Sequence, residues 1–293
     1  MKRLSSVALA ATLLAVGASG AAHAGEIETG GKLLLTHGVS TVEGSAGGGL
    51  STWAVIAGAE TNRGVGAEVH GTYVDVKDYS LRTYGAAVGW HDRLELSAAR
   101  QEFDTGATGA KLGLGKGFTF KQTVLGAKVR VLGDAVYSQD SWVPQVSVGA
   151  QYKDNSQDAI VRAVGAKKDS GVDFYVAATK VLLDKSLVLN GTVRLTKANQ
   201  SGLLGFGGDK GDSYKPQFEG SAGYLLSKRL VVGAEYRTKP SNLGFAKEDD
   251  WKDLFVAYAV NRHLSVTGAY VDLGDIATFK NQRGFYLSLQ AGF

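Results

Sequence analysis

Apolar and polar residues alternate with a period of two along most of this chain, in stretches of about ten residues. In residues 187–196, for example, the odd positions are Leu, Val or Gly, and the even positions are mainly Asn, Thr and Arg. The same alternation recurs at residues 125–131, 146–152 and 264–270. One apolar and one polar face at this length is typical of strands between lipid and an aqueous lumen.

The connections between these stretches differ at the two strand ends. Very short polar turns occur at Thr61–Arg63, His91–Arg93, Asp184–Lys185, Ser227–Arg229 and Asn261–His263. Longer segments rich in Gly, Asp, Lys and Ser lie between them, at Asp104–Gly117, Asp154–Ser170, Lys197–Ser213 and Thr238–Asp250. Short turns at one end and long loops at the other are typical of outer-membrane barrels. The sequence therefore predicts an all-β, transmembrane antiparallel β-barrel.

Counting back from Phe293 predicts about fourteen strands, within a range of 12–16. The expected strands are 30–40, 51–60, 64–74, 80–90, 93–103, 120–132, 143–153, 172–183, 185–196, 214–225, 230–237, 251–260, 264–273 and 284–293. Two segments are ambiguous: 133–142 is long for the short-turn end, and 159–167 fits a strand or a helix. Aromatic residues near expected strand ends fit the headgroup level; they are Trp90, Phe103, Tyr152, Tyr224, Tyr236 and Tyr258.

The last expected strand has a further feature. Its outward positions are Phe285, Leu287, Leu289, Ala291 and Phe293. An alternating C-terminal strand that ends on Phe resembles the signal recognised by the outer-membrane assembly machinery, which we therefore expect as a partner.

Residues 1–24 are expected to be a cleaved signal peptide. Lys2 and Arg3 precede an apolar stretch too short to span a bilayer, and Ala22-His23-Ala24 supplies the small-x-small cleavage pattern. An N-terminal anchor helix is the alternative, but glycines follow the apolar run directly. No linker divides residues 25–293, so we expect a single barrel domain there, in the outer membrane of a Gram-negative bacterium.

The composition limits the classes of partner that we expect for this chain. Without Lys2 and Arg3 the chain has 30 basic and 28 acidic residues, with no basic stripe, which argues against nucleic acid. Cysteine is absent, and glycine, at 40 residues, is about twice its average frequency. Outer-membrane lipid and lipopolysaccharide are the expected surroundings, and a small solute is a possible cargo.

Charged and polar residues within the expected strands, on the face opposite the apolar one, are the candidate functional residues. A charge facing lipid costs about 2–4 kcal/mol at the bilayer midplane, so these side chains are expected to face the lumen. Arg82 lies near a strand end and shares its parity with apolar residues. Mixed charges can line a wet pore or pair across the lumen and block it. The lumen-facing candidates are Glu68, Arg82, Lys128, Arg130, Arg194, Gln217, Glu219, Glu235 and Arg237.

No catalytic, cofactor or metal site is expected. His70 shares a face with Glu68, but a nucleophile within hydrogen-bond reach is not evident from sequence, and no Gly-x-Ser-x-Gly motif occurs. Acidic residues at 209–212 and 248–250 can attract divalent cations, but solvated loop acids are the simpler interpretation.

Three functions remain open at this stage. The favoured one is a porin-like passive channel for small solutes. The alternative is a closed structural or adhesive barrel whose long loops bind a surface partner, and a lipid-modifying barrel enzyme ranks last. The apolar loop Gly202–Gly208 can constrict the lumen, contact lipopolysaccharide or a partner, or pack over the barrel mouth.

The sequence also resembles a bacterial family called domain of unknown function 3034. The resemblance rests on Val124–Tyr137, on Ser141–Gln145 and on Ala198–Gly208, and it extends over nearly the whole chain after residue 24. It implies an exported outer-membrane protein, and it supplies no substrate or catalytic residues.

Overall fold

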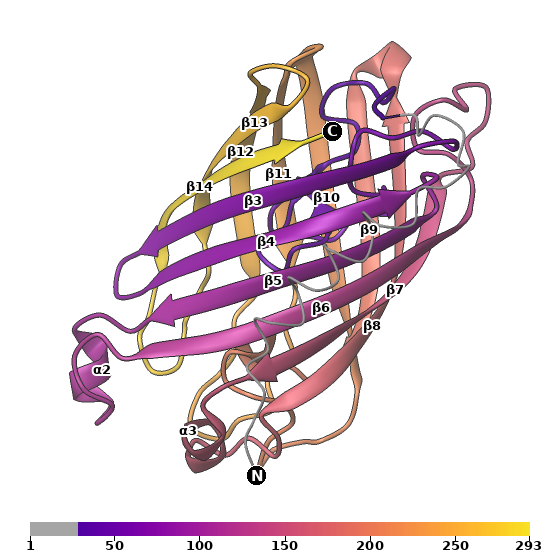
Figure 1. The fold of residues 1–293 in the computed structure, drawn as a ribbon. Coiled ribbons are helices and arrows are strands. Elements are labelled where there is room, and N and C mark those ends of the chain that lie inside the picture. The colour runs from indigo at the N-terminus through magenta and orange to yellow at the C-terminus, as the bar shows by residue number, and fades with distance from the viewer. Residues whose placement is uncertain (1–28) are drawn as a thin grey trace, which may run out of the picture.

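Twelve antiparallel strands close into one barrel in the computed structural model, which describes residues 29–293 (Figure 1). The expected signal peptide lies outside the described residues. The barrel strands are β3 (Val65–Val76), β4 (Ser80–Trp90), β5 (Leu94–Asp104), β6 (Thr119–Leu132), β7 (Gln145–Asn155), β8 (Ser170–Leu182), β9 (Leu187–Thr196), β10 (Lys215–Ser227), β11 (Leu230–Arg237), β12 (Trp251–Ala259), β13 (Leu264–Asp272) and β14 (Arg283–Gly292). Each strand pairs with its sequence neighbours, and β14 closes the barrel on β3, where Gln290 lies opposite His70.

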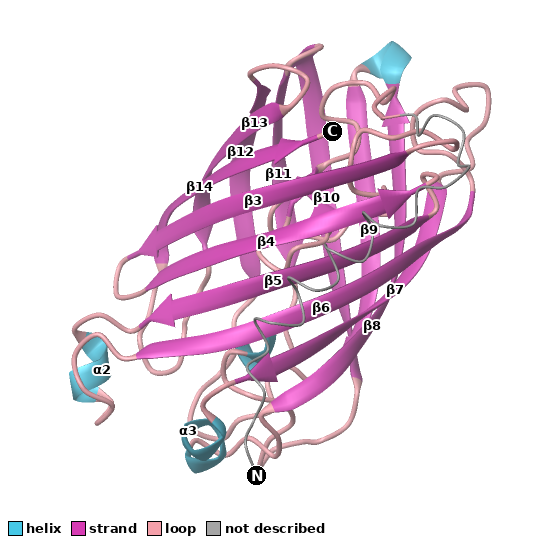
Figure 2. Cartoon of the chain, in the orientation of Figure 1, coloured by secondary structure: helices cyan, strands magenta, loops and turns pink. Residues whose placement is uncertain are grey.

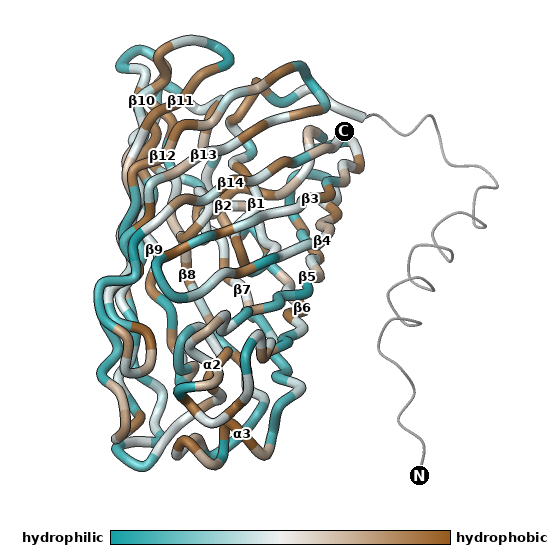
Figure 3. Tube along the Cα trace, turned by 90° about the vertical axis from the view of Figure 1, so that its left-hand side faces the viewer, coloured by the Kyte–Doolittle hydropathy of each residue, from teal (hydrophilic) through white to brown (hydrophobic). Residues whose placement is uncertain are grey.

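Alternate residues of each strand face outward and inward. In β12 the burial alternates at every residue from Trp251 to Ala259. β14 presents Phe285, Leu287, Leu289 and Ala291 outward, and Phe293, directly after it, is also exposed. Figure 3 shows the same alternation of hydropathy around the wall. Of the six aromatic residues expected at strand ends, five are exposed on the outside, whereas Phe103 is buried inside. None of the helices within residues 29–293 is long and apolar enough to cross a membrane.

The two ends of the barrel differ in their connections. At the short-turn end, where Phe293 lies, the connections are brief apart from residues 133–144 (Figure 2). At the long-loop end lie segments 105–118, 156–169, 197–214, 238–250 and 273–282. The short helical segments are α2 (Thr108–Lys111), α3 (Asp158–Ala163), η1 (Leu183–Lys185) and η2 (Asn199–Gly202). The ambiguous segment 159–167 therefore begins as helix α3.

Two of the fourteen expected strands are absent from the barrel, so the count of about fourteen is wrong and twelve is observed. The expected strand 51–60 and residues 35–40 of the other lie inside the lumen, whereas Gly31 and Leu33 are exposed. Inside the lumen the chain forms only two two-residue strands, β1 (Val39–Ser40) and β2 (Ala46–Gly47), which pair with each other. The physical reason is that every residue from 38 to 58 is buried, so neither face is available to lipid.

Candidate functional site

The lumen is filled by residues 31–60, which we call the plug. The plug enters and leaves at the short-turn end (Figure 1) and reverses direction near the paired strands β1 and β2 (Figure 3). It is anchored at that end, where the Ala59 amide donates to the Phe293 carbonyl at 3.1 Å. The lumen is therefore a packed interior, and its polar wall residues bind the plug.

Wall carboxylates accept hydrogen bonds from the plug backbone. The Leu50 amide donates to Glu235 at 2.7 Å, and the Thr52 amide donates to Glu219 at 2.7 Å. A third such bond runs from the Ala57 amide to Glu95 at 2.9 Å. Buried backbone groups need partners, and because most of the plug has no strand ladder, the wall side chains supply them.

Plug carbonyls are satisfied by wall donors in the same way. Lys128 donates to the Val55 carbonyl at 2.7 Å, and Thr192 donates to the Thr52 carbonyl at 2.6 Å. The Gln145 amide donates to the Ala54 carbonyl at 2.6 Å. These donors come from β6, β9 and β7, so the plug is held from several sides of the barrel.

Glu43 of the plug joins a buried cluster of charges. Its carboxylate lies within ion-pair distance of Lys153, of Arg194 at 3.5 Å and of Arg237 at 3.0 Å. Two wall acids complete the cluster: Asp173 pairs with Lys153 at 2.7 Å, and Glu219 pairs with Arg194 at 2.5 Å.

The charges of this cluster balance only when the plug is in place. The wall contributes three cations and two anions, and Glu43 supplies the third anion. Without Glu43, a buried positive charge would lack a partner, which costs several kcal/mol in a low-dielectric interior.

At the short-turn end a second set of charges fixes the entry of the plug. Lys32 donates to the Ile56 carbonyl at 2.8 Å and pairs with Asp92 in the β4–β5 turn at 2.9 Å. Glu60 is fully buried beside Lys32, at 3.6 Å, and burial raises the pKa of Glu60 to about 7. Arg130 also pairs with Asp92, which extends this set to the wall.

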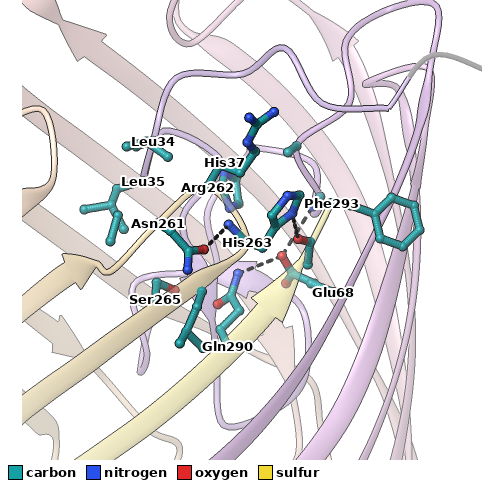
Figure 4. Close-up of a pocket in the computed structure, with 15 residues that line it drawn as sticks. Leu34, Leu35, His37, Glu68, Asn261, Arg262, His263, Ser265, Gln290 and Phe293 are labelled. Atoms are coloured by element: carbon teal, nitrogen blue, oxygen red, sulfur yellow. Dashed lines mark hydrogen bonds between the residues drawn. The ribbon is translucent and has the colours of Figure 1, made fainter.

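A small pocket remains between the plug and the wall at this end (Figure 4). It holds about 20 Å³, room for about one water molecule. Beside it, Gln290 donates to Glu68 at 2.8 Å, and the Gly58 amide of the plug donates to Glu68 at 3.3 Å. The pocket is a packing gap and is too small to pass a solute.

The long-loop end is closed by apolar side chains from the loops. Every residue of the loop Gly202–Gly208 is buried. Leu203 and Leu204 join one apolar cluster with Val42 and Leu50 of the plug. Of the placements open from sequence, the structure shows this loop packed over the barrel mouth.

The lumen candidates fall into three groups. Glu68, Lys128, Arg194, Glu219, Glu235 and Arg237 are buried inside the barrel. Arg130 and Gln217 point inward near opposite ends and are half-buried. Arg82 is a correction: its side chain faces outward, with its guanidinium 5.9 Å from the centre of the Tyr73 ring. Its parity is that of the exposed residues of β4, and it lies near the long-loop end, where a charge can reach water.

Several residues of the site are not among the candidates from sequence. Glu95, Lys153 and Asp173 share the inward parity of their strands, and that parity is the signal that could have found them. Glu43 is not among the candidates because it lies between two segments, 30–40 and 51–60, that are expected to be strands of the wall. Its signal is that Glu43 is the only charged residue between 38 and 58.

The catalytic and metal candidates have no supporting geometry. The buried ring nitrogens of His70 form no hydrogen bond with any residue from 29 to 293. Within the same residues, no three His, Asp or Glu side chains are grouped to hold a metal ion. Of the loop acids, Glu248 pairs with Lys239 at 3.2 Å, and Asp209 accepts from the Gly244 amide at 2.6 Å.

Comparisons with known proteins agree with the barrel architecture. A family model described as "Protein of unknown function (DUF3034)" matches residues 36–290. The KdgM porin is similar in structure, with a TM-score of 0.51 and 10% identity over 77% of this chain and 99% of that chain. The NanC porin has a TM-score of 0.47 and 11% identity over 78% and 98%. The outer membrane phospholipase A of Escherichia coli has a TM-score of 0.42 and 10% identity over 78% and 92%. No curated protein sequence matches the chain. The fold is thus a porin-like barrel.

Proposed function

Because the chain belongs to the DUF3034 family, whose description assigns no function, we propose its function from the geometry of the lumen. It is a porin-like channel of the bacterial outer membrane that its own N-terminal plug holds closed, and small solutes pass when the plug moves. By the rule for outer-membrane barrels, the short-turn end faces the periplasm and the long-loop end faces outward. The plug thus enters from the periplasmic side.

The observation that carries this proposal is the kind of contact that holds the plug. Wall side chains bind it through hydrogen bonds and ion pairs, such as those of Glu235 and Arg237, and water can replace each of them. Between residues 38 and 58 the plug has few large side chains and many Gly, Ala, Ser and Thr residues. Its few large apolar side chains, among them Leu50, Trp53 and Val55, pack against apolar residues of the wall. The apolar surface exposed on release is therefore limited to these few side chains.

A channel of this size is physically reasonable. Eight-stranded barrels are filled by the side chains of their own walls, whereas sixteen-stranded porins contain a wide aqueous channel. Twelve strands lie between these limits, and here the wall leaves enough room for a whole chain segment. A lumen that holds the plug also has room for a small solute once the plug is displaced.

A cysteine cross-link tests the proposal. The hydroxyls of Ser51 in the plug and Ser221 in the wall are hydrogen-bonded, and the chain has no cysteine of its own. The double variant Ser51→Cys/Ser221→Cys should tether the plug when oxidised. In a planar bilayer we expect stepwise currents from the wild type and from the reduced double variant, and none from the oxidised form.

The two single variants, Ser51→Cys and Ser221→Cys, are the matched controls, and their currents should not respond to oxidant. Currents of equal size in the oxidised and reduced double variant would refute plug-controlled conduction. If neither the folded wild type nor the reduced double variant gives any current, the second candidate is favoured: a closed structural barrel that acts through its loops. The interlocked plug and the apolar closure at the long-loop end are the observations that favour that candidate.

We also propose that the protein is not an enzyme, because the polar residues of the lumen hold the plug. The His70 ring has no hydrogen-bonded partner among residues 29–293, and so lacks the nucleophile and the orienting carboxylate that a catalytic histidine requires.

A further inference from the structure

A separate apolar cavity lies between the barrel wall and the long loops. Its volume is about 290 Å³. The wall contributes Val74, Phe120 and Trp251, and the loops contribute Ile160, Leu203 and Phe245, among others. None of its lining residues is charged. Native interiors are packed nearly as densely as organic crystals, so an unfilled space of this size needs an explanation.

Water is a poor occupant of this cavity. A buried water molecule needs about two to four polar partners. The polar groups of the lining are the side chains of Ser80, Thr105 and Gln200, the Tyr79 hydroxyl and the Trp251 indole N–H. The Tyr79 hydroxyl donates to the Ile276 carbonyl at 3.4 Å, and the Trp251 N–H has no partner among residues 29–293. The Thr105 hydroxyl already donates to the Phe118 carbonyl at 2.8 Å, and the Gln200 carbonyl oxygen accepts from Lys239 at 2.9 Å.

We propose that the cavity is a binding site for one uncharged, mainly hydrocarbon molecule, aromatic or aliphatic. A cavity of about 150 Å³ holds benzene, so this one has room for about ten to twelve non-hydrogen atoms. The ammonium nitrogen of Lys239 lies 4.7 Å from the centre of the Trp251 ring, but Lys239 is paired with Glu248. A charged ligand would therefore find no free counter-ion there. This inference does not depend on whether the plug moves.

The route of access to the site favours a free molecule over the acyl chain of a membrane lipid. The strand ladder around the barrel is closed, so a lipid chain has no path through the wall. The exposed rim belongs to the loops, where Phe245 is 38% exposed. A ligand would therefore enter from the long-loop end.

Quenching of Trp251 fluorescence tests the site. The full chain in phosphatidylcholine vesicles is titrated with 1-bromonaphthalene, whose heavy atom quenches a tryptophan that it touches. We expect saturable quenching that is absent in Trp251→Phe, because Trp53 is buried in the plug and Trp90 and Trp142 are exposed outside. Naphthalene-1-sulfonate, of the same shape but charged, should give no saturable signal.

Two residues of β3 supply a matched pair of variants. Val74 lines the cavity and is 3% exposed, whereas Val69 faces outward and is 56% exposed. Val74→Phe should weaken binding at least about tenfold, because the larger side chain would occupy part of the cavity and the ligand would no longer fit without strain, and Val69→Phe should not. Ile160→Phe in the loop helix α3 should act like Val74→Phe without touching the wall. Folding of each variant is checked by the heat-dependent shift in its electrophoretic mobility.

Three outcomes would overturn the inference. Quenching could remain unsaturated and equal in Val74→Phe, Ile160→Phe and the wild type, which would mean that the probe only partitions into lipid. The sulfonate could bind as well as the neutral probe. Finally, vesicles made from phosphatidylcholine with brominated chains could quench Trp251 without any added probe, which would identify a lipid chain as the occupant.

Discussion

Glu43 in the plug and Arg237 in β11 form a bidentate ion pair inside the barrel. The two guanidinium nitrogens lie 3.0 and 3.1 Å from the two carboxylate oxygens, although the residues are 194 positions apart in the sequence. Both side chains are almost fully buried. This pair joins the plug to the wall at the point where the charges of the lumen balance, so it is the natural place to test how firmly the plug is held.

Glu43→Gln should loosen the plug. The variant leaves Lys153, Arg194 and Arg237 with two buried anions, and loss of one partner of a buried pair costs about 3–5 kcal/mol. The effect is measured in an Ala54→Cys background, because Ala54 is fully buried in the plug. The rate at which a water-soluble maleimide labels the introduced thiol should rise more than about a hundredfold.

Asp272→Asn is the control for a surface charge. Asp272 pairs with Arg283 at 2.9 Å, but the cation is 55% exposed, and exposed pairs contribute about 0–1 kcal/mol. In the same Ala54→Cys background, this variant should leave the labelling rate of the introduced thiol unchanged. Equal labelling rates in the Glu43→Gln and Asp272→Asn proteins would mean that the buried cluster does not hold the plug.

Gly48→Ala should displace the tip of the plug. A methyl group at Gly48 would overlap the Glu235 carboxylate, which also binds the Leu50 amide. Gly268 in β13 is the matched control, because a methyl group there meets nothing within 4 Å. In urea titrations of the protein in vesicles we expect Gly48→Ala to lower the free energy of unfolding by about 1–3 kcal/mol and Gly268→Ala to leave it nearly unchanged. A smaller loss for Gly48→Ala than for Gly268→Ala would contradict the close packing of plug and wall.

The twelve wall strands could be predicted from sequence because lipid imposes a strict rule on them. Residues 80–90 and 230–237 were predicted with the bounds that the structure shows, and the other ten differ by a few residues at most. A barrel strand must place an apolar side chain outward at every second position, so the alternation is direct evidence of the environment. The same rule gave the direction of most lumen residues, and it failed for Arg82 because strand ends lie near water.

The plug could not be predicted by that rule because it contacts no lipid. Residues 51–60 resemble a strand only loosely, since Ala54, Val55, Ile56 and Ala57 form an unbroken apolar run. A segment enclosed by a polar lumen needs small residues and partners for its backbone, and it needs no alternation. Pairing across the lumen, as between Glu43 and Lys153, depends on which strands face each other after closure, and one sequence contains no information on that.

Phe293→Ala should slow assembly of the barrel more than it destabilises the folded protein. We propose that the outward residues Phe285, Leu287, Leu289, Ala291 and Phe293 form the signal read by the assembly machinery. In the folded state the Phe293 ring is 47% exposed, while its backbone carbonyl accepts from the Ala59 and Ala67 amides regardless of the side chain.

Pulse-chase labelling of the Phe293→Ala protein in cells should show slower appearance of the folded form, with little change in the free energy of unfolding in urea. Leu254→Ala, which removes another outward side chain (67% exposed), is the control and should assemble normally; equal delays in both variants would argue against a C-terminal signal.

Raising the pH from 5 to 8 should favour release of the plug, and Glu60 should account for part of this dependence. Burial raises the pKa of Glu60 to about 7 from its ordinary value near 4.5, although Lys32 beside it opposes that shift and Asp92 adds to it. The seated plug therefore binds a proton more tightly than a plug in water. The stabilisation is complete below about pH 4.5 and is lost as the pH rises through 7.

Glu60→Gln removes the titrating group, so the probability of channel opening should change less between pH 5 and 8 in that variant than in the wild type. Glu102→Gln, which changes a partly exposed carboxylate on the outer face, should keep the full pH dependence. An unchanged pH profile in Glu60→Gln would show that Glu60 does not titrate as the plug is released.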